Sequence, residues 1–267
     1  MRNWKKILRL LGMFLGVIAV LAGLAFVDRS NGRVEVTDVE VVVSGPDGIH
    51  FVDAAGIERE VLDLGGEVLG ARLGEVRLAA IEDRLNAIPV VDHADVYHTL
   101  DGVVHVRVRQ REPIARVLNK DGSGFYIDAG GWTFPTSDAH TARVLVFLGD
   151  IQEEGADRGV HQVNADDSLG ALSLSDEIHH LASFIHADPF LDALVDQVLV
   201  NERREFELIP RVGGHRILIG DGSHLEERFA KLIEFYEKGM RQVDWRRYSR
   251  IDLRFTDQIV CTQRTTP

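Results

Sequence analysis

The feature that most constrains the fold of this chain is an apolar stretch near its N-terminus. No residue from Leu10 to Val27 is ionisable, and the nine residues before it carry four basic side chains and no acid. As a helix, residues 7–27 would span roughly 31 Å, which matches the hydrocarbon core of about 30 Å in a bilayer. Because basic flanks are retained in the cytoplasm, the pattern predicts a cytoplasmic tail over residues 1–9, a transmembrane helix in the lipid bilayer over residues 10–28, and export of the remainder.

A cleaved signal peptide is the main alternative for this stretch, because Gly23-Leu24-Ala25 has the small-x-small form of a cleavage site. The apolar part of a signal peptide is about 7–15 residues long, however, and this stretch is longer. A buried helix of a soluble protein is disfavoured because the stretch is apolar on every face. The sequence therefore favours a retained anchor.

Composition narrows the class of protein further. The chain has 45% apolar and 27% charged residues, which is typical of a folded globular protein. Its 30 basic and 42 acidic residues give a net charge of −12, which argues against nucleic acid as a partner. Cys261 is the single cysteine, so no disulfide can form within the chain, and no neighbouring base motif marks this thiol as a nucleophile.

Residues 34–110 have the pattern of one compact α+β domain. Alternating valines over 39–43 predict a strand, and two helical stripes follow, the first capped by Asp53 and the second ending before Pro89. Two further alternating runs flank a turn at 100–102, which is typical of a hairpin. The order strand–helix–helix–strand–strand places two helices on one face of a small sheet, and it is the order of a POTRA domain.

Residues 111–264 predict a second domain, an antiparallel β-sheet with flanking helices. Several alternating runs precede a long amphipathic helix over residues 225–236. The last run, residues 249–262, is interpreted as a single strand with the apolar residues 251, 253 and 255 facing one way. Because it follows the last helix, it is predicted to be a C-terminal edge strand.

Three stretches in this order resemble the FtsQ/DivIB family of bacterial cell-division proteins: Ile88–Val91 with Ala94 and Val96, Arg111–Arg116, and Arg250–Phe255. Together with the tail, the anchor and the two domains, the resemblance covers nearly the whole chain, although the cytoplasmic tail is short for the family. The resemblance implies a scaffold without catalysis or cofactor. It also implies a single-pass protein of the inner membrane at the division septum, with its N-terminus in the cytoplasm and its bulk in the periplasm.

The same resemblance implies partners. Members of the family bind two single-pass coiled-coil proteins, FtsL and FtsB, within the septal divisome, and the FtsB-like partner adds a strand to the far end of the β domain. An edge strand suits this role because its unpaired N–H and C=O groups can pair with an added strand. By position, the contact is expected at Arg254, Phe255, Thr256, Gln258, Ile259 and Val260. Alternatively, Phe255 and Val260 pack in the core and Arg254 is an ordinary exposed charge.

The POTRA unit is linked in the family to recruitment of other membrane-embedded division proteins. Two strands of this unit, residues 39–43 and 104–109, are candidate edges for that contact. No single residue in either strand stands out as a partner contact. The acidic charge of the exported part does not by itself identify a partner.

The alternative from a different class is a membrane-tethered periplasmic cell-wall hydrolase. Asp128 and Asp150 could form its acid pair, although Asp128 also fits the turn before Gly130. Metal sites are disfavoured because neither the histidines at 179, 180 and 186 nor the loop group at 161, 166 and 167 has the spacing of a known helical or calcium site. A POTRA-bearing outer-membrane assembly factor is disfavoured because the sequence after residue 110 lacks a long series of barrel strands.

Overall fold

A computed structural model describes residues 13–19, 34–64, 68–153, 159–163, 173–239 and 245–264. Residues 13–19 are helical, while the predicted tail over 1–9 and most of the predicted anchor over 10–28 lie outside the described residues. Within the described part of the chain, no helix has both the length and the apolar character needed to cross a bilayer. The chain divides into two compact units, the first comprising Met1–Ser44 with Val52–Gln110 and the second Gly45–Phe51 with Arg111–Pro267.

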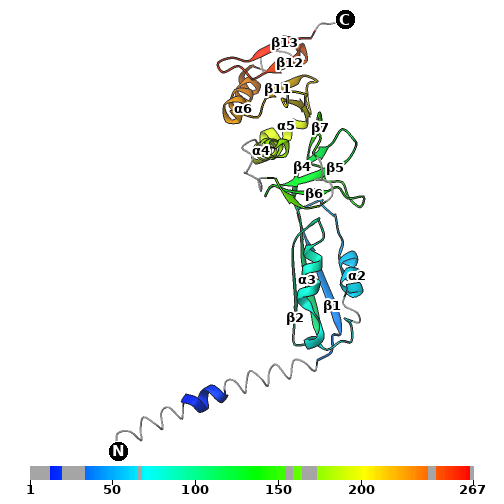
Figure 1. The fold of residues 1–267 in the computed structure, drawn as a ribbon. Coiled ribbons are helices and arrows are strands. Elements are labelled where there is room, and N and C mark those ends of the chain that lie inside the picture. The colour runs from blue at the N-terminus through cyan, green and yellow to red at the C-terminus, as the bar shows by residue number, and fades with distance from the viewer. Residues whose placement is uncertain are drawn as a thin grey trace, which may run out of the picture. The chain divides into compact units, whose positions relative to one another are not determined.

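The first unit has the predicted order of strands and helices (Figure 1). Its elements are β1 (Asp38–Ser44), α2 (Ala54–Leu64), a 3-10 turn (Leu73–Glu75), α3 (Leu78–Asn86), β2 (Val91–His98) and β3 (Val103–Gln110). The sheet order is β1-β3-β2, with β1 parallel to β3 and β2 antiparallel to it. Strand β3 is therefore central, which corrects the expectation that residues 104–109 form an edge.

Helix–sheet packing forms the core of the first unit. Ile57 and Val61 of α2 and Ile81 and Leu85 of α3 are buried in one cluster with the inward-facing valines of the strands. As predicted, Asp53 caps α2, because its Oδ1 accepts a hydrogen bond from the Gly56 N–H at 2.7 Å. Local patterns predict this α+β arrangement, because each strand and each helix shows the hydrophobic period of its own type.

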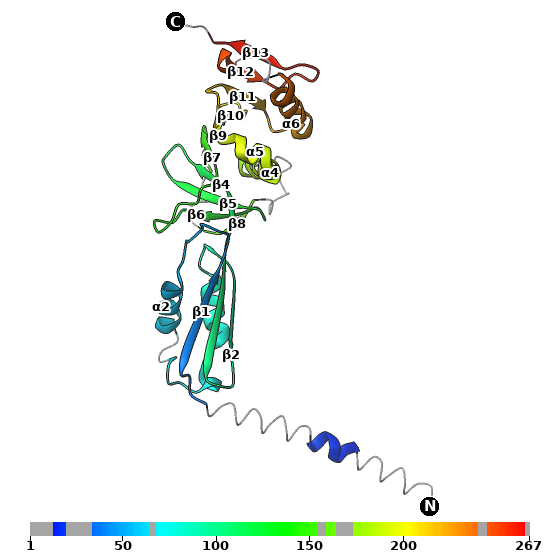
Figure 2. The ribbon, with the colours of Figure 1, turned by 180° about the vertical axis from the view of Figure 1, so that it is seen from behind.

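The second unit is built on a ten-stranded sheet in the order β13-β12-β11-β10-β9-β7-β4-β5-β6-β8, which Figure 2 shows from behind. Its strands are β4 (Pro113–Leu118), β5 (Gly124–Asp128), β6 (Trp132–Pro135), β7 (Leu145–Gly149), β8 (His161–Gln162), β9 (Val195–Val200), β10 (Phe206–Pro210), β11 (Arg216–Gly220), β12 (Tyr248–Asp252) and β13 (Val260–Gln263). The helical elements are α4 (Leu174–Ala187), α5 (Pro189–Leu194), α6 (Leu225–Glu234), a π-helical turn (Phe235–Gly239) and a 3-10 turn (Trp245–Arg247).

This sheet is mixed, which corrects the expectation of an antiparallel sheet. The pairs β4–β7, β7–β9 and β11–β12 are parallel, and the other pairs are antiparallel. For two of the parallel pairs, the direction follows from the connection between the strands. Helices α4 and α5 lie in the chain between β7 and β9, and α6 lies between β11 and β12. A strand that follows a crossover helix can return parallel to the strand before it, whereas a short hairpin cannot give that direction.

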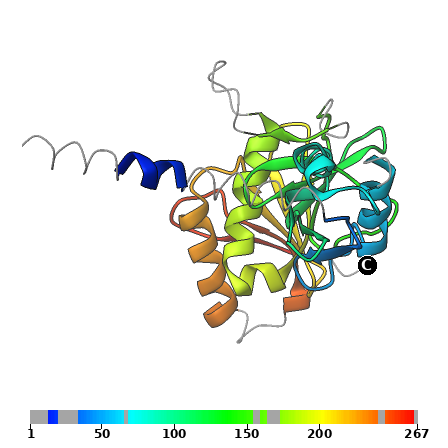
Figure 3. The same ribbon diagram turned by 90° about the horizontal axis from the view of Figure 1, so that it is seen from below.

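Helices α4 and α6 lie side by side on one face of the ten-stranded sheet (Figure 3). The rings of Phe184 in α4 and Phe229 in α6 stack with centroids 5.1 Å apart. A capping box begins α4, in which Ser173 and Asp176 exchange side-chain to backbone hydrogen bonds. Together the helices cover a core that extends to Ile251 and Leu253, next to the end of the sheet.

The predicted strand over residues 249–262 is in fact a hairpin. Strand β12 ends at Asp252, a loop covers residues 253–259, and β13 returns antiparallel to β12. Ile251 and Leu253 are buried as expected, but Phe255 is 44% exposed because the loop has already left the strand direction. The alternation therefore holds only up to residue 253.

Candidate partner-binding edge

Strand β13 lies at one end of the ten-stranded sheet. Among the described residues it pairs with β12 alone, so its other side carries no strand. The Arg264 N–H donates to the Arg247 carbonyl at 2.8 Å, which directs the backbone of residue 264 toward the neighbouring strand. Because backbone groups alternate along a strand, Cys261 and Gln263 present their N–H and C=O groups to the open side. An extended segment could pair with these groups.

The six predicted contact residues surround this edge but do not all belong to it. Val260 is in β13, whereas the other five lie in the 253–259 loop. Phe255 and Val260 are 44% and 40% exposed, which rules out the alternative that both are core residues. Ile259 is half-buried and packs against the core, as does Cys261, whose thiol pKa is raised by burial.

Lys231 of α6 fixes the loop in place. Its ammonium group donates to the carbonyl oxygens of Leu253 (3.4 Å), Phe255 (2.5 Å) and Thr256 (3.0 Å). One cation thus satisfies several backbone acceptors that a loop of this shape would leave open. The Phe255 side chain is consequently presented to solvent from a loop that is held by a helix.

Arg254 is engaged within the unit. Its guanidinium lies 2.8 Å from Glu205 and 2.9 Å from Asp252, and its side chain is 38% exposed. A hydrogen bond from Asn201, and then those from Arg254, lower the pKa of Glu205 below its ordinary 4.5. Burial alone would raise the pKa of Asp252, but the hydrogen bonds from Arg254 outweigh it and lower this pKa below 3.8. Arg254 therefore joins the hairpin loop to the turn before β10, which makes it a positioning residue of the edge.

The Arg254 network predicts a pH-dependent contribution to stability. Carboxyl groups with lowered pKa values stabilise the fold fully above their unfolded values of 4.5 and 3.8, and this contribution is lost as the pH falls through the lowered values. We expect Arg254→Met to reduce the free energy of unfolding at pH 7, and the difference from wild type to shrink as the pH falls below about 4. Urea denaturation across this pH range measures the difference. A difference that stays constant down to acid pH would contradict the proposed network.

The candidate catalytic carboxylates each have a basic partner. Asp128 forms an ion pair with Arg111 at 3.0 Å, and both side chains are nearly buried. Asp128 also accepts the Trp132 N–H at 2.8 Å, as expected of a residue that holds the β5–β6 turn. Asp150 pairs with Lys120. Both carboxylates thus have structural roles.

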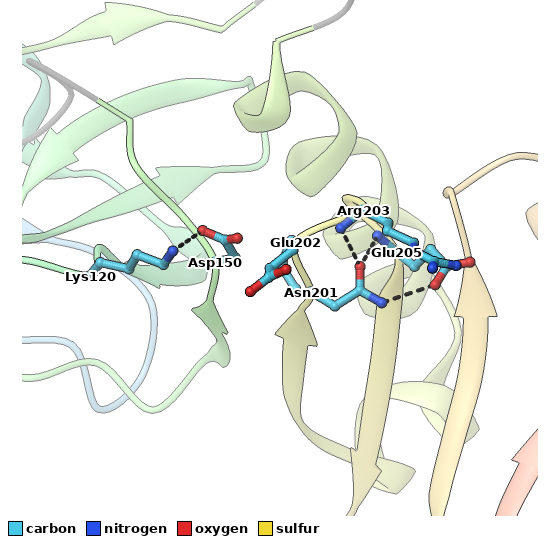
Figure 4. A pocket seen from close by; sticks show the side chains of 7 residues that line it. Lys120, Asp150, Asn201, Glu202, Arg203 and Glu205 are labelled. Carbon is cyan, nitrogen blue, oxygen red and sulfur yellow. Dashed lines mark hydrogen bonds and ion pairs between the residues drawn. The ribbon is translucent and has the colours of Figure 1, made fainter.

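Asp150 lines an open pocket of about 540 Å³, which Figure 4 shows from close by. The pocket is lined by Lys120, Asp150, Val200, Asn201, Glu202, Arg203 and Glu205. The Asn201 side chain stabilises its own turn, because its Oδ1 accepts hydrogen bonds from the backbone N–H groups of Arg203 and Glu205. In the part of the chain that the structure describes, no three His, Cys, Asp or Glu side chains gather as a metal site. Asp166 and Asp167 of the loop group at residues 161–167 lie outside the described residues.

The sheet of the first unit has one closed edge and one open edge. On β2, the Ala94 N–H donates to the Asn86 side chain at 2.9 Å, and the same amide donates back to the Ala94 carbonyl at 3.4 Å. The Val96 N–H donates to Glu82 at 3.2 Å. Side chains of α3 thus occupy the outer backbone groups of β2, a common way to blunt an edge. Among the described residues no strand pairs with the outer side of β1, where Val42 is 49% exposed.

Sequence reasoning missed Lys231 and Gln263. Gln263 is one residue beyond the predicted end of the last strand, and extending the alternation by one position would have included it. Lys231 carries no such signal, because its three carbonyl partners follow it by 22 to 25 residues. Contacts of that kind become visible only in the folded chain.

Comparison with known proteins gives a consistent result. The family model described as "FtsQ/DivIB, C-terminal related" matches residues 112–262, which is more than half of the chain, and the "POTRA-like domain" model matches residues 35–109. The chain is 26% identical over 269 residues to the "Cell division protein FtsQ" of Rhodothermus marinus. That alignment covers 98% of this chain and 89% of the relative.

Proposed function

Because this chain belongs to the FtsQ/DivIB family and is a cell-division protein, we propose that it works as a single-pass scaffold of the septal divisome. Residues 10–28 anchor it in the inner membrane, residues 1–9 remain in the cytoplasm, and the two units lie in the periplasm. The basic N-terminus and the uncharged stretch after it support this placement. The net charge of −12 supports protein partners rather than nucleic acid.

The scaffold recruits its main partner by strand addition at β13. The observation that carries this proposal is the open side of β13 at the end of a ten-stranded sheet. An FtsB-like protein, together with its FtsL-like companion, supplies the added strand. Phe255 and Val260 add apolar contacts beside the backbone pairing, and the side-chain pockets next to an added strand give such interfaces their specificity. Strand β1 of the first unit offers a second edge to another divisome protein.

Crosslinking in cells tests the proposal. A photoreactive residue at Val260 or Gln263 should crosslink to a small single-pass coiled-coil protein, and one at the exposed Arg59 of α2, which belongs to the first unit, should not. Capture of no such protein at either edge position would refute the scaffold proposal.

A charge substitution gives a second test of the same edge. Val260→Glu should abolish recovery of the partner in a pulldown, because an added strand would have to bury a carboxylate without a counter-charge. Val260→Thr is the matched control, since it keeps the size and β-branching of valine and should retain the partner. Equal recovery with Val260→Glu and Val260→Thr would contradict a contact at this residue.

Absence of catalysis is part of the proposal, and the ion pairs of Asp128 and Asp150 support it. Incubating the full-length protein with purified peptidoglycan should release no fragments above the level of a heat-denatured sample. Fragment release that is lost in Asp128→Asn or Asp150→Asn would instead favour the wall-hydrolase alternative.

A further inference from the structure

Two exposed leucines lie in turns of the first unit. Leu69 is 46% exposed and Leu100 is 65% exposed. Single exposed leucines are ordinary on protein surfaces, so their exposure alone carries no meaning. These two leucines differ from other exposed leucines because their loops are hydrogen-bonded to residues 34–37. Those residues follow the apolar N-terminal stretch.

The loop with Leu69 is held by a pair of backbone hydrogen bonds. The Gly70 N–H donates to the Val36 carbonyl at 2.8 Å, and the Val36 N–H donates to the Ala71 carbonyl at 2.8 Å. The Leu73 N–H donates to the Val34 carbonyl at 2.9 Å. Leu69 is therefore placed directly beside residues 34–36.

The loop with Leu100 is held to the same stretch from another side. The Thr37 N–H donates to the Gly102 carbonyl at 2.9 Å. Gly102 has φ +93° and approaches Glu35 so closely that a Cβ would stand 2.6 Å from the Glu35 carbonyl oxygen. Only glycine tolerates both conditions, so the close approach of this turn to Glu35 depends on the glycine at position 102.

The reach of the chain limits how far these loops can be from a bilayer. The six residue steps from Asp28 to Val34 extend at most about 22 Å. The headgroup layer outside the hydrocarbon core takes up roughly 5–8 Å of this distance. If Asp28 is the end of a membrane anchor, residues 34–37 and the loops bonded to them are confined near the membrane surface.

The geometry points to a lipid-binding contact: Leu69 and Leu100 insert into the interfacial region of the bilayer beside the chain's own anchor. The contact rests on the proposed transmembrane segment over residues 10–28. Moving leucine side chains from water to the acyl boundary is favourable, and two such contacts would restrain the first unit on the membrane. Asp101 keeps the insertion shallow, because its charged carboxylate, whose pKa is lowered by a hydrogen bond from Thr99, is costly to move out of water.

Depth-dependent quenching in the full-length protein tests the contact. Cys261 is the single cysteine, so Cys261→Ser gives a background for one label at a time. A fluorophore is attached at Leu69→Cys, Leu100→Cys or, as a matched control, Val42→Cys, which is 49% exposed in the native protein. Val42 is six residues past Val36, or about 20 Å along an extended chain. The protein is placed in phosphatidylcholine nanodiscs with and without a lipid that is spin-labelled near the headgroup.

We expect the spin-labelled lipid to remove most of the emission at positions 69 and 100 and to leave position 42 unchanged. Adding Leu69→Asp to the protein labelled at position 100 should restore much of that emission, since the charge draws this end of the unit back into water. If the chain enters nanodiscs but the spin-labelled lipid changes the emission equally at all three positions, the contact is overturned. The scaffold proposal would still stand. Failure of the chain to enter nanodiscs would overturn the anchor, and the contact with it.

Discussion

Replacing Gln263 by proline is expected to weaken binding of the proposed FtsB-like partner strongly, whereas Gln263→Ala should leave binding nearly unchanged. Gln263 is exposed at the end of β13, and its backbone is directed to the open side of the sheet. Proline lacks the N–H that an added strand must use, and its ring occupies the space next to that position. The same N–H makes no bond to β12, so the fold should be preserved.

The expected loss can be estimated from the hydrogen bond that is removed. One missing bond, plus one carbonyl of the partner left buried without a donor, costs about 2–4 kcal/mol, or roughly 30- to 1000-fold in Kd. Titration of the full-length protein in detergent with the partner measures this directly. Thermal unfolding of both variants should match wild type within a few degrees. Tight binding by Gln263→Pro would show that the partner does not pair with the backbone of β13.

The first unit could be predicted almost completely from the sequence, apart from the order of its strands. Alternating valines over residues 39–43 and the helical stripes at residues 57–61 and 81–85 each report a local period. The position of β1 is different, because a strand at the start of the chain can join either side of a hairpin. Here it pairs with β3, since the side chains of Asn86 and Glu82 already occupy the outer backbone groups of β2.

The second unit shows where local patterns cease to be sufficient. The predicted antiparallel direction is wrong for the parallel pairs. The helical stripe over residues 225–236 lies between two strands, and such a helix is itself a signal that these strands run parallel. The sequence predicts one strand where the structure has the hairpin at residues 248–263, because alternation continues to Phe255. Lys231 holds the loop through contacts with three of its carbonyl groups, and these contacts depend on the position of α6.

The partner-binding site stays a prediction, and the structure shows only how exposed and how engaged its six residues are. Exposure of Phe255 and Val260 agrees with a role in contact, while Arg254 proved to be held by Glu205, 49 residues earlier in the sequence. A charged residue on a predicted strand gives no sign of whether its partner lies within the same chain. Pairing over such distances depends on the sheet order, which a single sequence does not reveal.

Breaking the Arg111–Asp128 pair is expected to have the largest effect on stability. Each of these side chains is only about a tenth exposed, so Arg111→Met leaves a buried carboxylate without its cation. Removing one partner of such a pair costs about 3–5 kcal/mol. The double variant Arg111→Met/Asp128→Asn should recover most of this loss, because the amide oxygen of asparagine can still accept the Trp132 N–H and no charge remains. Urea denaturation of the full-length protein gives the free energy of unfolding for each variant.

The matched control is the exposed pair between Arg84 and Glu60, whose nitrogen and oxygen atoms are also 3.0 Å apart. Arg84→Met should cost no more than about 1 kcal/mol, because water screens charges at the surface. The contrast between two ion pairs of equal length then isolates burial as the cause. If Arg111→Met were as mild as Arg84→Met, Asp128 would not depend on its cation, and a role for this carboxylate outside the β5–β6 turn would have to be reconsidered.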